Sequence, residues 1–163
     1  MLRFDVSPLL DAEPGESLRW DVDVQDRELG DVEIDFLEGE VQVIRVQKGL
    51  LARAELETRV RAECVRCLNP FTLPLSLEID QIVKIPGTKP DTETLYTVTE
   101  DGWLDFVPIA REYIWLDLPM KTLCSADCKG LCPHCGINRN LETCDCEEED
   151  IDPRMSALKE LLD

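Results

Sequence analysis

Residues 52–64 read ARAELETRVRAEC, and two kinds of side chain alternate along this stretch. Every odd position holds Arg or Glu, and the even positions hold small or apolar residues: Ala52, Ala54, Leu56, Thr58, Val60, Ala62 and Cys64. Successive side chains of a β-strand point to opposite faces of its sheet. The stretch therefore predicts a long strand with one buried face and one solvent face, whose mixed charges suit cross-strand ion pairs.

A second apolar alternation starts at Phe71, continues through Leu73, Leu75, Leu77 and Ile79, and ends near Ile85. The residues between the two stretches read VRCLNP, from Val65 to Pro70. We expect an antiparallel hairpin with Cys64 and Cys67 at its tip.

The chain before this hairpin shows further strand patterns. Apolar residues alternate at 18–24 and 32–36, and another apolar stretch covers 41–46. Glu38-Gly39-Glu40 is interpreted as a turn between two of these strands.

After the hairpin, residues 86–101 are rich in Pro, Gly, Thr and acidic residues and predict a loop. Residues 104–118 predict a helix that has Pro108 in its first turn and ends before Pro119. Asp152 as N-cap and Pro153 as first helical residue predict a short C-terminal helix, with an apolar face formed by Met155, Leu158, Leu161 and Leu162.

These elements predict an α+β fold. An antiparallel sheet, possibly barrel-like, carries one central helix, a Cys-rich module and the short C-terminal helix. Six of the eight cysteines lie in this module in pairs at metal-ligand spacing, so it is predicted to be a zinc module. We predict a β-rich core over residues 1–120 and a zinc-binding module over residues 121–163 that is docked on the core.

Composition excludes some classes of function. The 163 residues carry a formal charge of −18, and eight thiolates holding two Zn²⁺ would lower it to about −22. A general phosphate-binding surface needs an excess of Lys and Arg, so this charge favours a basic partner instead. No apolar run is long enough to span a membrane, and residues 1–20 lack the features of a signal peptide. We therefore expect a cytoplasmic protein without a membrane partner.

Eight cysteines occur in pairs at ligand spacing: Cys64 and Cys67, Cys124 and Cys128, Cys132 and Cys135, Cys144 and Cys146. Two cysteines with two residues between them can supply two metal ligands from one tight turn, so we predict two structural zinc ions. Disulfides, a thioredoxin-like redox pair and an iron–sulfur cluster are alternatives. His134, the only histidine, is interpreted as solvent-facing or as a support for the ligands, with ligation or catalysis as alternatives.

The division of the ligands between the two ions follows from loop closure. Cys132, Cys135, Cys144 and Cys146 are close in sequence and can surround one ion at a small entropy cost. Cys64, Cys67, Cys124 and Cys128 would then hold the other ion and tie the hairpin tip to the segment after the helix.

Three motifs resemble those of the DUF177 or YceD family. Cys64-Val-Arg-Cys67-Leu-Asn-Pro-Phe71 is similar to its CxRCLxPF hairpin, and residues 124–138, CSADCKGLCPHCGIN, to its CxxDCxGLCPxCGxN signature. Cys144-Asp-Cys146 and the DPR motif at 152–154 match its closing motifs. The resemblance implies a non-enzymatic factor that supports accumulation of large-subunit (23S) ribosomal RNA and assembly of the large ribosomal subunit.

Two rival functions remain at this point: a zinc ribbon that binds ribosomal RNA directly and a hydrolase that processes it. Lys121, Lys129, Arg139 and Arg66 lie near cysteines and form a candidate RNA-binding patch. A catalytic zinc usually keeps an open position, and eight cysteines make two complete sets of four. We therefore expect recruitment to a precursor of the large subunit, through a basic ribosomal protein that meets the acidic run Glu147–Asp150 and the solvent face of the hairpin.

Overall fold

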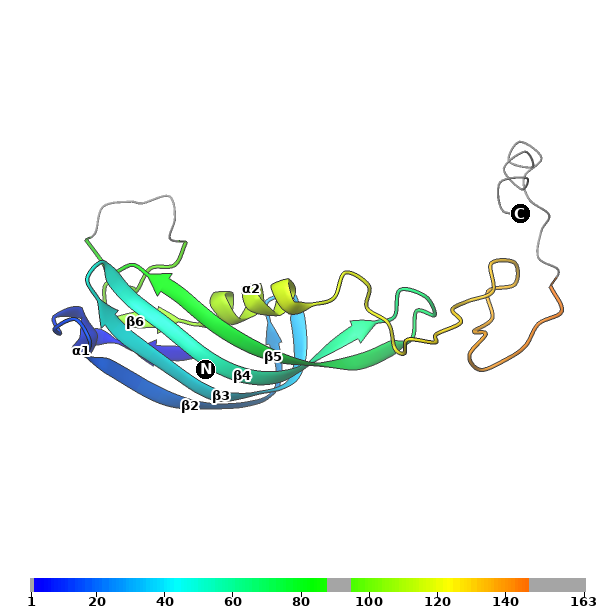
Figure 1. Cartoon of the computed structure of the whole chain (residues 1–163), viewed down its shortest axis with the longest axis horizontal. Helices are drawn as coiled ribbons and strands as arrows, with labels where there is room; N and C mark the ends of the chain where they lie inside the picture. Colours follow the sequence, from blue (N-terminus) through cyan, green and yellow to red (C-terminus); the bar gives the residue numbers. More distant parts are fainter. Residues whose placement is uncertain (1, 88–94, 147–163) are drawn as a thin grey trace, which may run out of the picture.

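The computed structural model describes residues 2–87 and 95–146, and its main element is a four-stranded antiparallel sheet. The strands lie in the order β2 (Ser17–Leu29), β3 (Val32–Val46), β4 (Gly49–Glu63) and β5 (Pro70–Val83). Each strand pairs with the next one in sequence, so the sheet is a meander (Figure 1).

The predicted hairpin is confirmed as β4 and β5. Their register runs without a break from Leu50 opposite Val83 to Glu63 opposite Pro70. The even positions of β4 from Ala52 to Val60 are buried and the odd positions from Arg53 to Arg61 are exposed, as the alternation in the sequence predicts. The buried hydroxyl of Thr58 donates to the carbonyl of Phe36 at 2.6 Å, so this polar group is satisfied inside the core.

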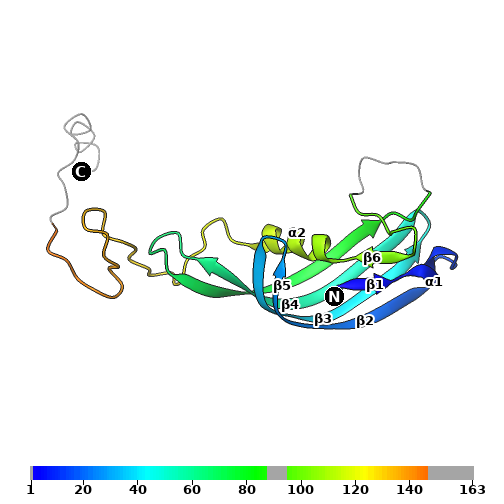
Figure 2. The same cartoon turned by 180° about the vertical axis from the view of Figure 1, so that it is seen from behind.

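One face of the curved sheet is covered by the remaining elements (Figures 1 and 2). These are β1 (Arg3–Asp5), α1 (Ser7–Leu10), β6 (Trp103–Asp105) and α2 (Val107–Asp117), and β1 pairs with β6 in a separate two-stranded sheet. Phe4 packs against Trp20 and Phe106, with ring centroids 5.0 Å and 5.6 Å away. A separate small sheet and two helices thus fill the concave face.

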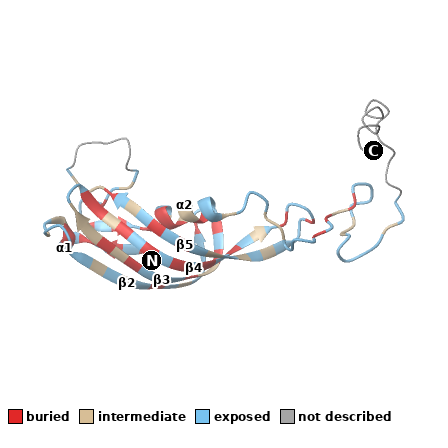
Figure 3. Cartoon of the chain, viewed as in Figure 1, coloured by how far each residue is buried: buried red, intermediate tan, exposed pale blue. Residues whose placement is uncertain are grey.

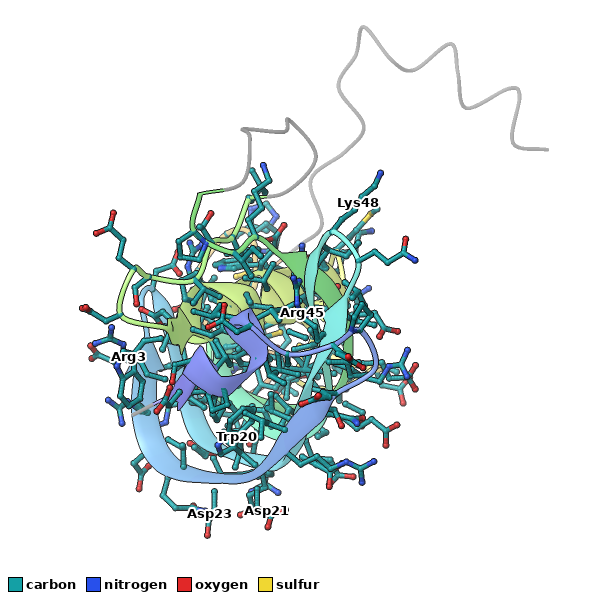
Figure 4. All side chains as sticks on the ribbon, turned by 90° about the vertical axis from the view of Figure 1, so that its left-hand side faces the viewer. Arg3, Trp20, Asp21, Asp23, Arg45 and Lys48 are labelled. Carbon is teal, nitrogen blue, oxygen red and sulfur yellow. The ribbon has the colours of Figure 1, made fainter. Side chains whose placement is uncertain are left out.

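The barrel-like alternative is wrong. In the described part of the chain β2 and β5 are the two edges of an open sheet, because the concave face is closed by β1, β6 and the helices instead of by strand pairing. Viewed end-on, Trp20 points toward the interior, and Asp21 and Asp23 of the same strand point out to solvent (Figure 4).

The central helix begins later than predicted. Residues 103–105 pair with β1 as a strand, and the helix starts at Val107 with Pro108 in its first turn. Leu104 fits the helical spacing of the apolar residues that follow it, but its backbone pairs with that of Phe4 in β1. The predicted C-terminal helix at 152–162 lies outside the described residues, and the division into domains at residue 120 stays a prediction.

The predicted turn at Glu38-Gly39-Glu40 is also wrong, because β3 runs through it without interruption. Gly39 has φ +143° and lies against β4, where a Cβ atom would come within 2.1 Å of the Glu55 carbonyl oxygen. This glycine therefore marks a close approach between strands. A bulge between Ile34 and Phe36 also turns Phe36 outward, beneath the guanidinium of Arg59, and leaves Leu37 buried.

We expect Gly39→Ala to lower the free energy of unfolding by about 2–4 kcal/mol, because it adds both backbone strain and a collision. Gly15→Ala is the matched control, since Gly15 also has positive φ but no atom lies within 4 Å of the position that a Cβ atom would take there. Urea unfolding followed by circular dichroism measures both variants. If Gly39→Ala and Gly15→Ala lowered the free energy of unfolding equally, backbone strain alone would account for the effect, and β3 would not pass this close to β4.

Candidate metal centres

The first group of cysteines joins the hairpin tip to the segment after α2. Cys64 and Cys67 lie in a tight turn, closed by the amide of Leu68 donating to the carbonyl of Cys64 at 2.9 Å, and Leu68 takes a left-handed φ of 57°. Cys124 and Cys128 come from the segment after the helix, and the four Sγ atoms lie within 4.8 Å of one another.

Hydrogen bonds outside the thiols hold this segment on the hairpin. The amide of Val65 donates to the carbonyl of Thr122 at 3.0 Å, and the Thr122 hydroxyl donates to the carbonyl of Glu63 at 2.9 Å. The Arg66 guanidinium donates to the Cys128 carbonyl at 2.9 Å. The first group is therefore held by one backbone and two side-chain hydrogen bonds to backbone carbonyls, between segments about sixty residues apart.

The second group is built locally from Cys132, Cys135, Cys144 and Cys146, whose Sγ atoms also lie within 4.8 Å of one another. The amide of Gly136 donates to the carbonyl of Cys132 at 2.9 Å, and its φ of +74° closes the turn between the first two cysteines. The segment at 121–146, which supplies Cys124, Cys128 and the whole second group, extends beyond the hairpin tip, and most of its residues are exposed (Figure 3).

The spacing of the sulfur atoms fits a tetrahedral metal site. A tetrahedron with metal–sulfur bonds near 2.3 Å has sulfur–sulfur edges of about 3.8 Å. Cys64 Sγ lies 3.8 Å from Cys128 Sγ, and Cys67 Sγ lies 3.7 Å from Cys124 Sγ. All eight cysteines are free of disulfides. Both groups could therefore hold a metal ion, and the two sets are those predicted from loop closure.

The thiols within each group differ in pKa because they have different hydrogen-bond partners. The backbone amide of Cys124 lowers the pKa of the Cys64 thiol to about 6, and the amide of Cys135 lowers that of Cys132 to about 6. Hydrogen bonding to Cys128 raises the pKa of Cys124 to about 12, and hydrogen bonding to Cys135 does the same for Cys146. Four neighbouring thiols cannot all ionise without a cation among them, which a bound metal would supply.

The two groups differ in burial. Cys64, Cys67 and Cys128 are buried in the first group, and Phe71 and Leu123 pack against them. In the second group only Cys132 is buried. Water and competing ligands therefore reach the second group more easily.

Asn140 is a supporting residue that sequence reasoning missed. Its amide nitrogen donates to Cys128 Sγ at 3.3 Å and to Asn138 Oδ1 at 2.8 Å, and its Oδ1 accepts from the amide of Lys129 at 2.7 Å. It thus connects the loop of the second group to a thiol of the first. Its position two residues after the Cys-rich signature at 124–138 is the only signal that the sequence offers.

We expect Asn140→Ala to weaken metal binding at the first group by about 10- to 100-fold, the range for a lost ligand support. Asn69→Ala is the control, since Asn69 has an exposed side chain and lies next to the turn that carries Cys64 and Cys67 of the first group. Competition with a coloured chelator measures the affinity. An unchanged affinity in Asn140→Ala would assign Asn140 to loop structure alone.

The other predicted residues are placed as follows. His134 is exposed and belongs to neither group of four, although it lines a hollow of about 220 Å³ beside the second group. Lys129 and Arg139 line the same hollow, whereas Lys121 and Arg66 do not. The predicted basic patch is therefore only partly assembled, and it contains Glu142 as well. Over the described residues, no helix is both long enough and apolar enough to cross a membrane.

Comparison with known proteins places these features in a family. Residues 52–162 match the family model described as "Large ribosomal RNA subunit accumulation protein YceD". The Mycobacterium tuberculosis protein Rv2926c is 29% identical over 130 residues, which cover 78% of this chain and 62% of that protein. The Bacillus subtilis protein YlbN is 27% identical over 100 residues, covering 61% of this chain and 58% of that protein.

A third relative carries a functional name. The Arabidopsis thaliana protein "Large ribosomal RNA subunit accumulation protein YCED homolog 1, chloroplastic" is 27% identical over 151 residues, covering 74% of this chain and 47% of that protein. The chain thus aligns with less than two thirds of the length of each of these relatives. No solved structure matches it. Because the family model covers both the hairpin and all eight cysteines, the chain belongs to the YceD family.

Proposed function

We propose that this chain is a non-enzymatic protein that holds two zinc ions and supports the accumulation of large-subunit ribosomal RNA during assembly of the large ribosomal subunit. The observation that carries the proposal is the presence of two complete sets of four thiols within the part of the chain that matches the family. The ribosomal role rests on the names of the family and of its chloroplast relative.

A structural role for the metal is supported by the ligand count. A catalytic zinc usually has three protein ligands and an open position for water, whereas four thiolates complete a tetrahedron. Four thiolates can also hold an iron–sulfur cluster, but the sulfur–sulfur distances of the first group suit a single ion. We propose zinc as that ion. His134, the only histidine, belongs to neither set of four thiols, and it lines the hollow beside the second group together with Lys129 and Arg139.

A basic protein partner is supported by the solvent face of the sheet. Seven exposed carboxylates form an acidic band in two adjacent rows across the strands: Asp21, Glu40, Glu55 and Glu78 in one row, and Asp23, Glu38 and Glu57 in the other. Like charges directly opposite one another destabilise a sheet by about 0.2–1 kcal/mol per pair. A cationic partner would relieve this repulsion, and a bare RNA surface would increase it. The acidic run at 147–150, assigned to the same contact, lies outside the described residues.

Direct RNA binding is the second candidate, and the hollow lined by Lys129, His134 and Arg139 favours it. The same hollow is lined by three thiols of the second group and by Glu142. With metal bound, the four thiolates leave a net negative charge beside the two cations. This arrangement supports a contact made after docking better than a primary RNA-binding surface.

The cellular test is deletion of the gene in the source organism. We expect the ratio of large-subunit to small-subunit ribosomal RNA to fall, and a plasmid copy of the wild-type gene to restore it. The purified protein is expected to leave ribosomal RNA uncut. An unchanged ratio after deletion would overturn the ribosomal role, and metal-dependent cleavage would replace it with the hydrolase.

The partner test is capture of large-subunit components from lysate by the tagged protein, before and after ribonuclease treatment. We expect large-subunit proteins to remain bound after digestion, because the contact is made to protein. A capture that disappears with the RNA, together with binding of purified ribosomal RNA at physiological salt, would establish the RNA-binding candidate instead.

A further inference from the structure

An exposed tryptophan stands between two hollows beside the end of α2. Trp115 is 51% exposed, and its indole N–H donates to Asp31 Oδ1 at 3.4 Å. Arg111 binds the same carboxylate through Nε and Nη2 at 2.5 Å and 2.7 Å and lowers the pKa of Asp31 to about 2. Asp31 is therefore charged at neutral pH, and it fixes the indole and the guanidinium side by side.

The hollows on the two sides of Trp115 measure about 600 Å³ and 580 Å³, and both are lined by Asp31 and Trp115. The larger one has apolar walls that include Val32, Val60 and Leu118. The smaller one is lined by Tyr96, Pro108 and Arg111. We call the two hollows and Trp115 between them the Trp115 surface.

The larger hollow exists because two paired strands separate. Pairing between β3 and β4 ends at Ile34 opposite Val60, next to the bulge. Beyond this point residues 32–33 pair only with β2, and residues 61–63 pair only with β5. Thr122, which is bonded to Glu63, closes the far side of the hollow next to the first group of cysteines.

The side chains that line the Trp115 surface carry more negative than positive charge, which favours a partner with cationic side chains. Four carboxylates line it, those of Asp31, Glu33, Glu63 and Glu112. Its two guanidinium groups are already engaged. Arg111 binds Asp31, and Arg61 is shared by three carboxylates, those of Asp26, Asp35 and Glu33, at 2.9 Å, 2.8 Å and 3.8 Å. The surface thus combines a fixed aromatic anchor with carboxylates in excess over cations.

We propose that the Trp115 surface is the docking site for a basic protein segment with an apolar anchor. This proposal rests on the proposed recruitment to large-subunit proteins. An aliphatic or aromatic side chain of the segment enters the larger hollow beside Trp115 and Leu118. Lys or Arg residues on either side of it face Glu33 and Glu63. Fixed Trp, Tyr and Arg side chains in a hollow are typical of the residues that dominate protein interfaces. The lining carboxylates repel an RNA backbone.

The experiment uses the full chain with a photo-crosslinking amino acid in place of Leu116, which is 70% exposed next to Trp115. It is mixed with RNA-free protein extracted from purified large ribosomal subunits, and the crosslinked peptide is identified by mass spectrometry. A synthetic copy of that peptide is then titrated against wild type, Trp115→Ala and Glu63→Lys. Trp103→Ala and Glu13→Lys are the controls, since Trp103 is 40% exposed on β6 and Glu13 is exposed before β2.

We expect a crosslinked peptide with Lys or Arg flanking an apolar residue. Its affinity should fall about 30-fold in Trp115→Ala, and less in Glu63→Lys, with no change in the two controls. Unfolding curves and metal content should match wild type in every variant, which separates binding from folding. Equal affinity in wild type and Trp115→Ala would overturn the docking site while leaving recruitment to large-subunit proteins intact. Failure of wild type to bind any extracted protein would overturn both, and crosslinking only to added ribosomal RNA would replace the segment by RNA.

Discussion

Removal of the metal from the purified protein is expected to unfold residues 121–146 and to leave the four-stranded sheet folded. We expect close to two zinc ions per chain before chelation. Over residues 121–146, all of which the structure describes, there is no helix or strand longer than an isolated bridge, and the buried side chains are those of Cys128 and Cys132. A structural zinc contributes about 10–16 kcal/mol of apparent binding free energy, and two such ions would here take the place of an apolar core.

Hydrogen exchange measured by mass spectrometry tests this expectation directly. Amides of 121–146 should lose protection after treatment with a strong chelator, whereas those of β3 and β4 should keep it, because their core is made of apolar side chains. Re-addition of zinc provides the control and should restore protection. Full protection of 121–146 in the metal-free protein would contradict a metal-dependent segment, and iron with visible absorption would replace zinc.

Separate substitution of Cys132 and Cys64 by serine is expected to give two different metal-depleted proteins, each with one ion. Cys132→Ser should free the loop at 129–146 and leave the first ion bound, because the first group takes no ligand from the loop. The first ion should bind more weakly, since the Asn140 contact to Cys128 Sγ is lost with the loop. Cys64→Ser should release 121–128 from the hairpin tip and keep the second group, whose ligands are all local. Serine fills nearly the same space but lacks the thiolate, so each variant isolates the loss of a ligand.

Elemental analysis counts the ions, and hydrogen exchange locates the change. The fully reduced wild type is the reference, and Ser125→Ala serves as a control substitution inside the same segment. If both cysteine variants lost the same ion and exposed the same residues, the division into 64/67/124/128 and 132/135/144/146 would be wrong. Retention of two ions in either variant would show that the substituted thiol is not a ligand.

The hairpin and the grouping of the cysteines could be predicted because both depend on short-range patterns. Period-two alternation over 52–64 reports which face of a strand is buried, whatever covers it. Ligand spacing within Cys132–Cys146 reports which thiols can converge without a large loop. The structure brings together the same two sets of four, and their ligation of metal stays a prediction.

Other elements could not be predicted because distant contacts override local signals. Gly39 suggests a turn in isolation, but its lack of a Cβ serves the approach of the Glu55 carbonyl on the next strand. Leu104 continues a helical spacing, but its backbone pairs with Phe4 near the other end of the sequence. The role of Asn140 likewise depends on Cys128 being brought beside it.

The sequence by itself determined the long hairpin, the position of a cysteine pair at its tip and the division of eight thiols into two sets, because strand periodicity and loop closure act over few residues. Only the tertiary structure decided that the sheet stays open and that seven carboxylates from four strands lie in two adjacent rows across it. It also decided that the Trp115 indole donates a hydrogen bond to Asp31 between two hollows. These features join residues that are up to about eighty positions apart. Their placement is set by strand register, by a bulge and by the packing of α2, which no local pattern in the chain records.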